Sequence, residues 1–454
     1  MSLPSLSSIL IGGSIMSTGA ISLMIAFRLA SRLWRLAMKR SSRLQHIVVL
    51  VLGDVGRSPR MQYHSVSLAD LPADVSLVGF PGEKCVDAVL KRKNIKHHFI
   101  TRPIFIEKKL PRPLSMPIKV CYQVCQLFWI LLWSLPQPDV LLLQNPPCIP
   151  TLFVALLAGF LRDFRIVVDW HNFGFTVLAM RFVSKDRHPL VRLARLYEIV
   201  LGRFCHGGLC VTQAMQRHLR EQWNIEASVL YDRPPDFFRQ QTQKEARDLF
   251  TRLADEYVAF KDLLSDSPPA LVVSSTSWTE DEDFSLLLDA IKDLDARPEK
   301  DLEGRLRPSL LFVITGKGPQ KAHYEKIIAS MHMKRCRVIT AWLAAEDYPR
   351  LLGSATLGVS LHTSTSGCDL PMKVVDMFGA GLPVCAVGFD CLDELVQHDK
   401  NGLVFSDSAE LANQMDDLLS NTKKLTALKE GVKEFQKKRW QENWNTSARH
   451  LFVR

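Results

Sequence analysis

Short, continuous apolar runs recur along the chain from residue 46 onward, and each is followed by Gly, Pro or polar residues. Runs without polar alternation are typical of parallel strands that helices cover on both faces. They fall into two series, separated by a Pro-containing segment near residues 231–236. The predicted strands are residues 46–52, 75–79, 96–99, 140–143, 165–168 and 208–212, then residues 270–274, 310–315, 337–340, 357–360 and 383–387.

The stretches between these strands are long enough for crossover helices, so the pattern predicts an α/β fold with two doubly wound halves. We expect an N-terminal domain over residues 46–235 and a C-terminal domain over residues 236–454. Ligands of such sheets bind beyond the carboxyl ends of the strands. Functional residues are therefore expected just after each strand.

A different pattern precedes the first strand. Residues 6–27 are apolar or small, and at about 1.5 Å per residue this run can cross a hydrocarbon core of roughly 30 Å. Basic residues follow the run, whereas a cleaved signal peptide carries them in front. The positive-inside rule then predicts a single-pass anchor at residues 1–27, a basic juxtamembrane segment at residues 28–45, and domains facing the cytosol. A signal peptide and a buried core helix are the alternatives.

The net charge of +10 does not indicate a nucleic-acid partner. Six Lys and Arg residues lie between residues 28 and 43, ahead of the first acid, Asp54, which leaves +4 for the rest of the chain. The charge therefore indicates the orientation of the chain in a membrane, because basic residues favour the cytosolic side. The ten cysteines show no paired spacing typical of zinc sites, which agrees with a reducing cytosol.

One predicted helix, residues 120–135, has no charge and contains Phe128, Trp129 and Trp133. It is either a core helix beneath the first sheet or a helix that enters the membrane interface. Its length is too short for a comfortable membrane span.

Polar residues that a core would not select follow two strands of the N-terminal half. After the first strand, Gly56 allows close approach of backbone amides, and Arg57 or Arg60 can pair with phosphate, although the spacing is not that of a dinucleotide-binding motif. Residues 169–174 (DWHNFG) follow another strand and contain His171 and Asn172. A solvated turn is the alternative for this second segment.

In the C-terminal half, glycines and hydroxyl side chains follow the strands. Residues 315–319 place a lysine among glycines, which suits a diphosphate, without the spacing of a Walker loop. Residues 364–373 bring hydroxyls and amides to a predicted helix N-terminus, which also indicates a phosphate site.

Eight segments in order resemble those of the chitobiosyldiphosphodolichol β-mannosyltransferases, between residues 53 and 384: DVGRSPRM, LLQNPP, DWHNFG, LYDRPP, SSTSWTEDEDF, ITGKGP, AEDYP and DLPMKVVDMFGAGLPV. The resemblance implies a GT-B fold, in which two Rossmann-like domains face a cleft. It also implies inverting transfer of mannose from GDP-mannose to GlcNAc2-diphosphodolichol, giving a β-1,4 linkage, on the cytosolic face of the endoplasmic reticulum membrane. GDP-mannose, the dolichol-linked acceptor and the lipid bilayer are the implied partners, with no tightly bound cofactor. The resemblance does not decide whether a divalent cation is needed or whether other mannosyltransferases of the dolichol pathway bind the protein.

The resemblance also assigns roles, with the acceptor in the N-terminal half and the nucleotide in the C-terminal half. Asp376, seven positions before Pro383, matches the acid that binds the nucleotide ribose in the wider GT-B pattern. That pattern has a second acid where this chain has Cys368, and a basic residue where it has residues 276–278. No metal ligand is assigned. The donor-binding candidates are Thr276, Ser277, Gly316, Lys317, Gly318, Ser366, Gly367 and Asp376.

Inversion requires a general base beside the acceptor hydroxyl. Asp54 is the first candidate, because the loop after the first strand is expected to face the cleft, and His171 is the second. Gly56, Arg57 and Asn172 are the acceptor-binding candidates.

Two other functions fit parts of the sequence. Residues 281–283 have the DxD form of the metal motif in the other large glycosyltransferase fold, but that fold has one main nucleotide domain. A non-catalytic membrane scaffold with the GT-B fold is favoured only by Cys368.

Overall fold

The computed structural model describes residues 46–101, 112–184, 187–279, 282–300, 304 and 306–453. The predicted anchor, residues 1–27, and the basic segment, residues 28–45, lie outside the described residues. Within the described part, no helix combines the length and apolar character needed to cross a membrane.

The chain divides into two units, each built on one sheet. Unit 1 comprises the described residues of Met1–Cys210, Gln216–Leu230 and Trp444–Arg454, and unit 2 comprises those of Val211–Met215 and Tyr231–Asn443. The change of unit after Leu230 lies close to the predicted boundary at residue 235. The C-terminal segment, however, was expected in the second domain and belongs to unit 1. Trp444 explains this difference, because it is fully buried and its Nε1 donates a hydrogen bond of 3.0 Å to His64 of unit 1.

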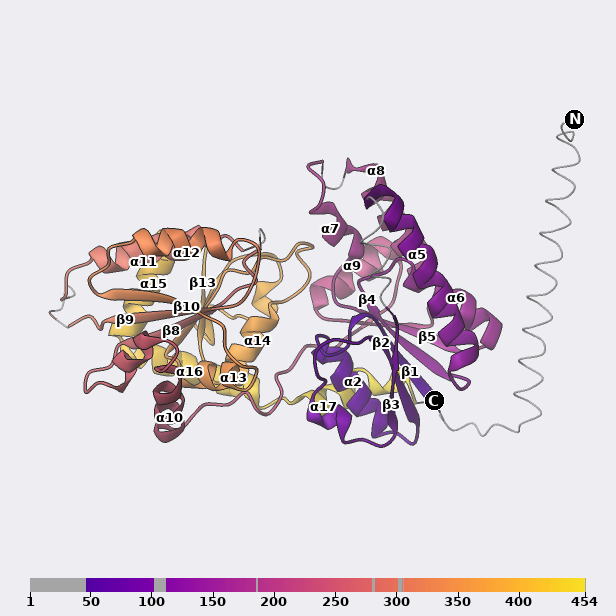
Figure 1. The fold of residues 1–454 in the computed structure, drawn as a ribbon, viewed down its shortest axis with the longest axis horizontal. Coiled ribbons are helices and arrows are strands. Elements are labelled where there is room, and N and C mark those ends of the chain that lie inside the picture. Colours follow the sequence, from indigo (N-terminus) through magenta and orange to yellow (C-terminus); the bar gives the residue numbers. More distant parts are fainter. Residues whose placement is uncertain are drawn as a thin grey trace, which may run out of the picture. The chain divides into compact units, whose positions relative to one another are not determined.

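Unit 1 contains a parallel seven-stranded sheet in the order β3-β2-β1-β4-β5-β6-β7 (Figure 1). The strands are β1 (His46–Asp54), β2 (Asp74–Phe80), β3 (Ile95–Phe99), β4 (Val140–Asn145), β5 (Arg165–Trp170), β6 (Gly207–Cys210) and β7 (Ser228–Val229). All six predicted strands are confirmed. The two-residue β7 at the sheet edge was missed, because so short a strand leaves no apolar run.

Helices cover both faces of this sheet. They are α2 (Pro59–Ala69), α3 (Asp87–Leu90), α5 (Arg112–Trp129), η1 (Ile130–Ser134), α6 (Thr151–Arg162), α7 (Gly174–Ala179), α8 (Pro189–Gly202) and α9 (Gln213–Trp223), with α17 (Trp440–Ser447) and η5 (Arg449–Leu451) at the end of the chain. Right-handed crossovers place α2 and α3 on one face, and α5, α6 and α8 form a layer on the other (Figure 1).

The uncharged helix of the sequence corresponds to α5 and η1, and it has two different faces. Leu127 and Leu131 are completely buried, as the core-helix interpretation requires. Trp129 and Trp133 are 64% and 60% exposed, and their rings lie 5.7 Å apart. Only one side of this helix is therefore accounted for by the core.

Unit 2 contains a parallel six-stranded sheet in the order β10-β9-β8-β11-β12-β13. The strands are β8 (Ala270–Ser275), β9 (Leu310–Thr315), β10 (Cys336–Ala341), β11 (Leu357–Ser360), β12 (Val384–Val387) and β13 (Gly402–Phe405). The five predicted strands are confirmed, and the edge strand β13 was missed.

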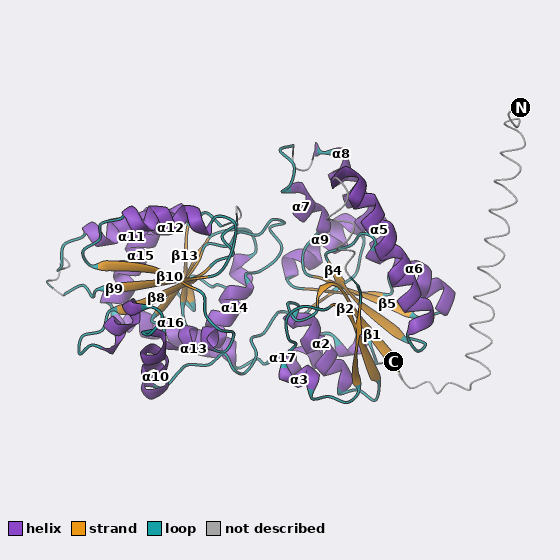
Figure 2. Cartoon of the chain, viewed as in Figure 1, coloured by secondary structure: helices purple, strands orange, loops and turns teal. Residues whose placement is uncertain are grey.

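Two cores lie on opposite faces of this sheet. Along β8, Leu271 and Val273 enter one core and Val272 enters the other, as the period-2 geometry of a strand requires. Figure 2 shows the helices that close the two faces. They are α11 (Ser285–Ala296), α12 (Lys321–Ser330) and α15 (Ser408–Ser420) on one side, and α10 (Gln243–Leu253), α13 (Asp347–Ser354), α14 (Met372–Gly379) and α16 (Thr422–Gln436) on the other, with the short 3-10 helices η3 (Val258–Leu264) and η4 (Leu392–Glu394).

Candidate active site

The strand order of unit 2 reverses between β8 and β11, which are neighbours in the sheet although two strands separate them in sequence. Crossovers on either side of such a switch point leave a crevice at the carboxyl ends of the two strands. Thr276 and Ser277 follow β8 directly, and residues 361–371 follow β11 and lead into α14. The predicted donor residues thus come from both sides of the switch point.

The glycines of the loop after β9 pack against the loop after β8. A Cβ at Gly316 would lie 1.8 Å from the carbonyl oxygen of Thr276, and one at Gly318 would lie 1.8 Å from that of Ser277. Gly316 also has a φ of 140°, which side chains rarely adopt. These positions therefore require glycine, and the structure brings these four donor candidates together.

A buried carboxylate lies beneath these loops. Glu282 is almost fully buried, and it accepts hydrogen bonds from the Thr276 hydroxyl and, at 2.7 Å, from the Ser277 amide. Lys373 on α14 forms an ion pair with Glu282, and its Nζ lies 3.2 Å from the Ser277 hydroxyl. The Lys373 side chain remains 25% exposed. The buried acid therefore holds a partly exposed cation beside the β8 loop.

Asp376 lies one turn beyond Lys373 on α14, and no described residue donates a hydrogen bond to its carboxylate. Burial, together with the negative charge of neighbouring Asp232, raises the pKa of Asp376 to about 8. Tyr348 also faces it, and burial raises the pKa of that phenol. A carboxylate held in this way has its acceptor oxygens available to hydroxyl donors.

The loop after β11 is organised by its own acid. Asp369 accepts hydrogen bonds from the hydroxyls of Ser364 and Ser366, the latter at 3.1 Å. Gly367 has a φ of 69°, in the left-handed region. The structure therefore places Ser366 and Gly367 in the turn that leads to α14, with the Ser366 hydroxyl already donating to an acid.

Lys317 lies at the carboxyl end of β9 but points to a different partner. Its Nζ lies 3.8 Å from the ring centroid of Trp342, which follows β10 and is half exposed. Two strands, β9 and β8, separate Trp342 from the β11 loop in the sheet. Lys317 is thus associated with the outer edge of the site rather than with Lys373.

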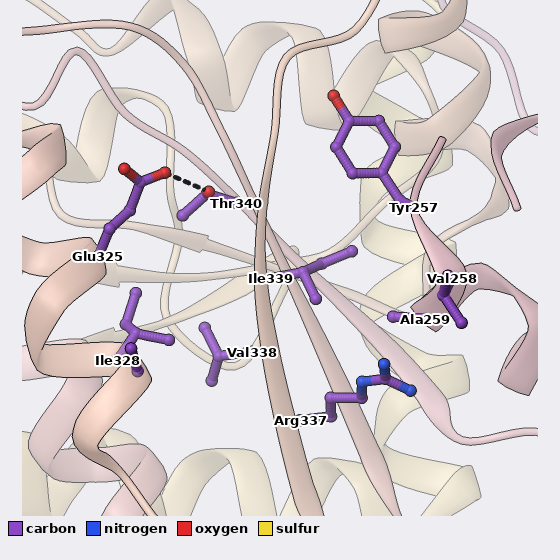
Figure 3. A pocket seen from close by; sticks show the side chains of 10 residues that line it. Tyr257, Val258, Ala259, Glu325, Ile328, Arg337, Val338, Ile339 and Thr340 are labelled. Atoms are coloured by element: carbon purple, nitrogen blue, oxygen red, sulfur yellow. Dashed lines mark hydrogen bonds between the residues drawn. The ribbon is translucent and has the colours of Figure 1, made fainter. Parts of the chain in front are cut away.

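A pocket of about 410 Å³ lies along the outer edge of β10 (Figure 3). Tyr257, Glu325 and residues 337–340 line it, and Thr340 donates a hydrogen bond of 2.7 Å to Glu325. None of the donor candidates lines this pocket, so it is separate from the switch point.

In unit 1, Asp54 at the end of β1 organises two loops. Its carboxylate accepts hydrogen bonds from the amides of Gly56 at 3.0 Å and Glu83 at 3.1 Å. Arg57 lies 3.7 Å from Asp54 and donates to the Glu83 side chain. The Asp54 carboxylate therefore holds the loops after β1 and β2 together, with its oxygens engaged by backbone amides.

Asp169 on β5 is the centre of a buried polar cluster. Arg60 is 4% exposed and pairs with both of its carboxylate oxygens, at 2.8 and 2.9 Å. His64 and His171 lie 3.1 and 2.7 Å from one of these oxygens. Burial opposes ionisation of Asp169, but Arg60, together with the two histidines, holds its pKa well below the usual range.

The hydrogen bonds of this cluster fix the protonation of His64. Trp444 Nε1 can only donate, so His64 Nδ1 must accept, and the proton of His64 lies on Nε2, directed at Asp169. Burial also lowers the pKa of His64. His64 therefore remains a neutral structural link.

His171 is the partly exposed member of the cluster, at 23% exposure. Its Nε2 donates to Asp169, which leaves Nδ1 as an acceptor. An imidazole oriented by a buried carboxylate in this way is a suitable general base. Asn172 follows, and its side-chain oxygen accepts from the Phe173 amide at 2.7 Å.

A family model described as Glycosyl transferases group 1 matches residues 256–435. The human protein named Chitobiosyldiphosphodolichol beta-mannosyltransferase is 44% identical over 434 residues, which cover 89% of this chain and 92% of that protein. The chain belongs to the chitobiosyldiphosphodolichol β-mannosyltransferase family. The resemblance in the sequence motifs is thereby confirmed.

Other relatives add to this family assignment. The Arabidopsis thaliana protein named UDP-glycosyltransferase TURAN is 43% identical over 450 residues, covering 89% of this chain and 96% of that protein. The structure of Anabaena HepE in complex with UDP-glucose matches with a TM-score of 0.61 at 17% identity, over 89% of this chain and 99% of that chain. The two parallel-sheet units are therefore the GT-B glycosyltransferase fold, and the DxD interpretation, which requires the other fold, is wrong.

Two ion pairs of this β-mannosyltransferase family member, Lys373–Glu282 and Arg60–Asp169, were not predicted from the sequence. Glu282 and Lys373 are 91 residues apart, and Asp169 and Arg60 are 109 apart. Residues 169–174, 281–283 and 364–373 were singled out from the sequence and contain Asp169, Glu282 and Lys373, but no local pattern indicates which partner each side chain contacts. Among the described residues, no group of three or more His, Cys, Asp or Glu side chains is arranged to hold a metal ion.

Proposed function

We propose that this chain transfers mannose from GDP-mannose to the 4-hydroxyl of the terminal GlcNAc of chitobiosyl-diphosphodolichol, with inversion at the anomeric carbon. Family membership supports the reaction. The observation that carries the donor assignment is Lys373, held by buried Glu282 against Ser277 at the switch point of unit 2. Lys373 thus brings a cation to the position where the wider GT-B pattern has a basic residue and this chain has residues 276–278.

The donor diphosphate would bind at the N-terminus of α14. The helix amides and dipole favour an anion there, and Lys373 provides the nearby positive charge. Asp376, one turn further, would accept hydrogen bonds from the ribose hydroxyls. As GDP departs, Lys373 and the amides of the Ser366–Gly367 turn stabilise the negative charge that develops on it.

His171 is the general base of this proposal, in preference to Asp54. Its Nδ1 takes the proton of the acceptor hydroxyl as that oxygen bonds to the anomeric carbon and the bond from this carbon to the diphosphate breaks. Asp169, ionised at neutral pH, stabilises the imidazolium that forms. Gly56, Arg57 and Asn172 remain the candidates for holding the acceptor.

The location of the enzyme follows from sequence features. An apolar run at residues 6–27 with basic residues after it supports a single-pass anchor in the endoplasmic reticulum membrane, with both units in the cytosol. The exposed Trp129 and Trp133 support a second contact with the bilayer, because such rings favour the membrane interface. No cofactor is required by this arrangement, and the need for a divalent cation is settled by assay in the presence of a chelator.

The decisive experiment incubates the purified full chain with a phytanyl-diphosphate-linked chitobiose and either GDP-mannose or a UDP-sugar. We expect a β-mannosidase-sensitive trisaccharide lipid with GDP-mannose alone. A product with UDP-sugars but none with GDP-mannose would refute the donor, and no product with any donor would favour a non-catalytic scaffold.

Two variants separate the candidates for the base. His171→Ala should lower kcat by about a hundredfold or more, because a general base contributes roughly 10²–10⁴-fold. Asp54→Asn should lower it less, since its amide oxygen can still accept one of the loop hydrogen bonds. In both variants GDP should bind with unchanged affinity. A larger loss of kcat in Asp54→Asn than in His171→Ala would identify Asp54 as the general base and refute His171.

A further inference from the structure

A pocket of about 280 Å³ lies between α7 and α8 of unit 1, apart from the groups assigned so far. Four apolar side chains and two arginines line it: Phe175, Val191, Leu196, Ile199, Arg192 and Arg195. Its volume is near the lower end of small-molecule sites, roughly 300 Å³. It can therefore hold the head region of an amphiphile but not a long chain.

The two arginines carry charge that no described acid neutralises. Arg195 lies over the Phe175 ring at 5.5 Å, and the guanidinium of Arg192 has no hydrogen-bond or ion-pair partner among the described residues. Glu198 is the sole acid in the sequences of α5, η1, α6 and α8, and it is fully buried. It faces inward and accepts a hydrogen bond of 2.9 Å from the side chain of Asn145. The outer surface of α8 is therefore basic without compensation.

The same surface is also apolar. Leu190, Leu193, Leu196 and Val200 are spaced along the outer face of α8 and are between 41% and 62% exposed. Leucines interleaved with arginines, without acids, complement an anionic lipid and not a neutral or basic partner. An anionic head at the arginines with an apolar tail along the leucines matches both features at once.

Glu198 also ties this pocket to the proposed base. The amides of Gly174 and Phe175 donate to its carboxylate at 2.8 and 2.9 Å, so α8 fixes the start of α7. His171 is four residues before Phe175, and four residues span at most about 14 Å. A lipid head in the pocket would lie within a disaccharide's reach of His171.

We propose that this pocket binds the diphosphate and the first isoprene units of the lipid acceptor, with Arg192 and Arg195 on the diphosphate and Leu196 beside the isoprenoid. This inference rests on the proposed function, and it assigns the acceptor's lipid head to residues outside the motif segments. The two sugar rings would extend from the pocket toward His171.

The test compares wild type with Arg192→Gln/Arg195→Gln, using the full chain in detergent micelles. The KM for phytanyl-diphosphate-linked chitobiose should rise about tenfold or more, because charge-assisted hydrogen bonds are lost. The kcat and the KM for GDP-mannose should stay within about twofold. Arg217→Gln, an exposed arginine of α9, is the matched control and should match wild type. An unchanged KM for the lipid acceptor in the double variant overturns the proposal.

A direct binding measurement separates this proposal from the reaction itself. Phytanyl diphosphate alone should bind wild type and Arg217→Gln equally, and the double variant about tenfold more weakly. If wild type makes no trisaccharide, the proposed function is wrong. The binding measurement still shows whether the pocket binds the lipid diphosphate. A double variant that loses affinity for phosphatidylinositol in the same micelles but keeps it for phytanyl diphosphate would show a general lipid surface and overturn the proposal.

Discussion

Asp376 is a carboxyl group whose burial should be unfavourable for stability and necessary for donor binding. Its folded pKa is about 8, raised by burial and by Asp232, whereas an unfolded Asp has a pKa of about 3.9. Asp376→Asn keeps the size of the side chain and removes the titration. We therefore expect the variant to unfold less readily than wild type at neutral and alkaline pH, while GDP binding weakens.

The sign and magnitude follow from proton linkage. Between about pH 4 and pH 8, the folded state holds a proton on Asp376 that the unfolded state has released, so the wild-type stability falls as pH rises, by up to about 1.4 kcal/mol per pH unit. The variant lacks this dependence. Its advantage in free energy of unfolding should thus grow by roughly 3–4 kcal/mol between about pH 5 and pH 8.

Donor affinity should change with pH in the opposite sense. Ribose hydroxyls donate to the ionised carboxylate, so the affinity of wild type for GDP should increase as pH rises towards about 8 and level off above it. Loss of hydrogen bonds to a charged acceptor should weaken GDP binding in the variant by about tenfold or more at pH 8.

Urea unfolding at several pH values, together with GDP titration calorimetry, measures both effects. Asp266→Asn is the matched control, since Asp266 is exposed, precedes β8 and has no side-chain hydrogen bond or ion pair among the described residues. Stability curves for Asp376→Asn and wild type that stay parallel from about pH 5 to pH 8 would refute the linkage argument. Unchanged GDP affinity would refute the assignment of Asp376 to the ribose.

Three further outcomes are expected. Lys373→Met should weaken GDP binding by about tenfold or more, and Lys317→Met by less than about threefold, in calorimetric titrations; equal losses would contradict the separate positions of the two cations. Asp169→Asn should lower the free energy of unfolding by about 3–5 kcal/mol, because it leaves a buried guanidinium without its partner, and a urea-unfolding loss below about 1 kcal/mol would contradict this. The double variant Trp129→Phe/Trp133→Phe should reduce the quenching of protein fluorescence by brominated lipids in reconstituted vesicles, and unchanged quenching would place these rings away from the bilayer.

The candidate site was predictable where function coincides with local pattern. Glycine pairs, hydroxyl-rich turns and positions after apolar strands predicted Thr276, Gly316 and Gly318, and the structure packs their loops together. The position of Asp54 after the first strand, together with the resemblance to inverting GT-B enzymes, favours it over His171 in the sequence. The amide partners of Asp54 at Gly56 and Glu83 are visible only in three dimensions, since Glu83 comes from another loop.

The sequence by itself determined the two-sheet α/β architecture. Burial on both faces demands continuous apolar strands, and this requirement acts on adjacent residues, so eleven of the thirteen strands are readable directly. The exceptions, β7 and β13, are short edge strands whose pairing depends on their neighbours.

Tertiary structure alone decided which charges meet. Lys373 forms an ion pair with Glu282, and Arg60 forms one with Asp169, because the strand order brings distant loops to the same sheet edge. A long side chain can reach many partners, and its sequence position does not encode which one burial will select. The apolar pattern therefore specifies the fold, whereas the electrostatics of the proposed site follow from how that fold assembles.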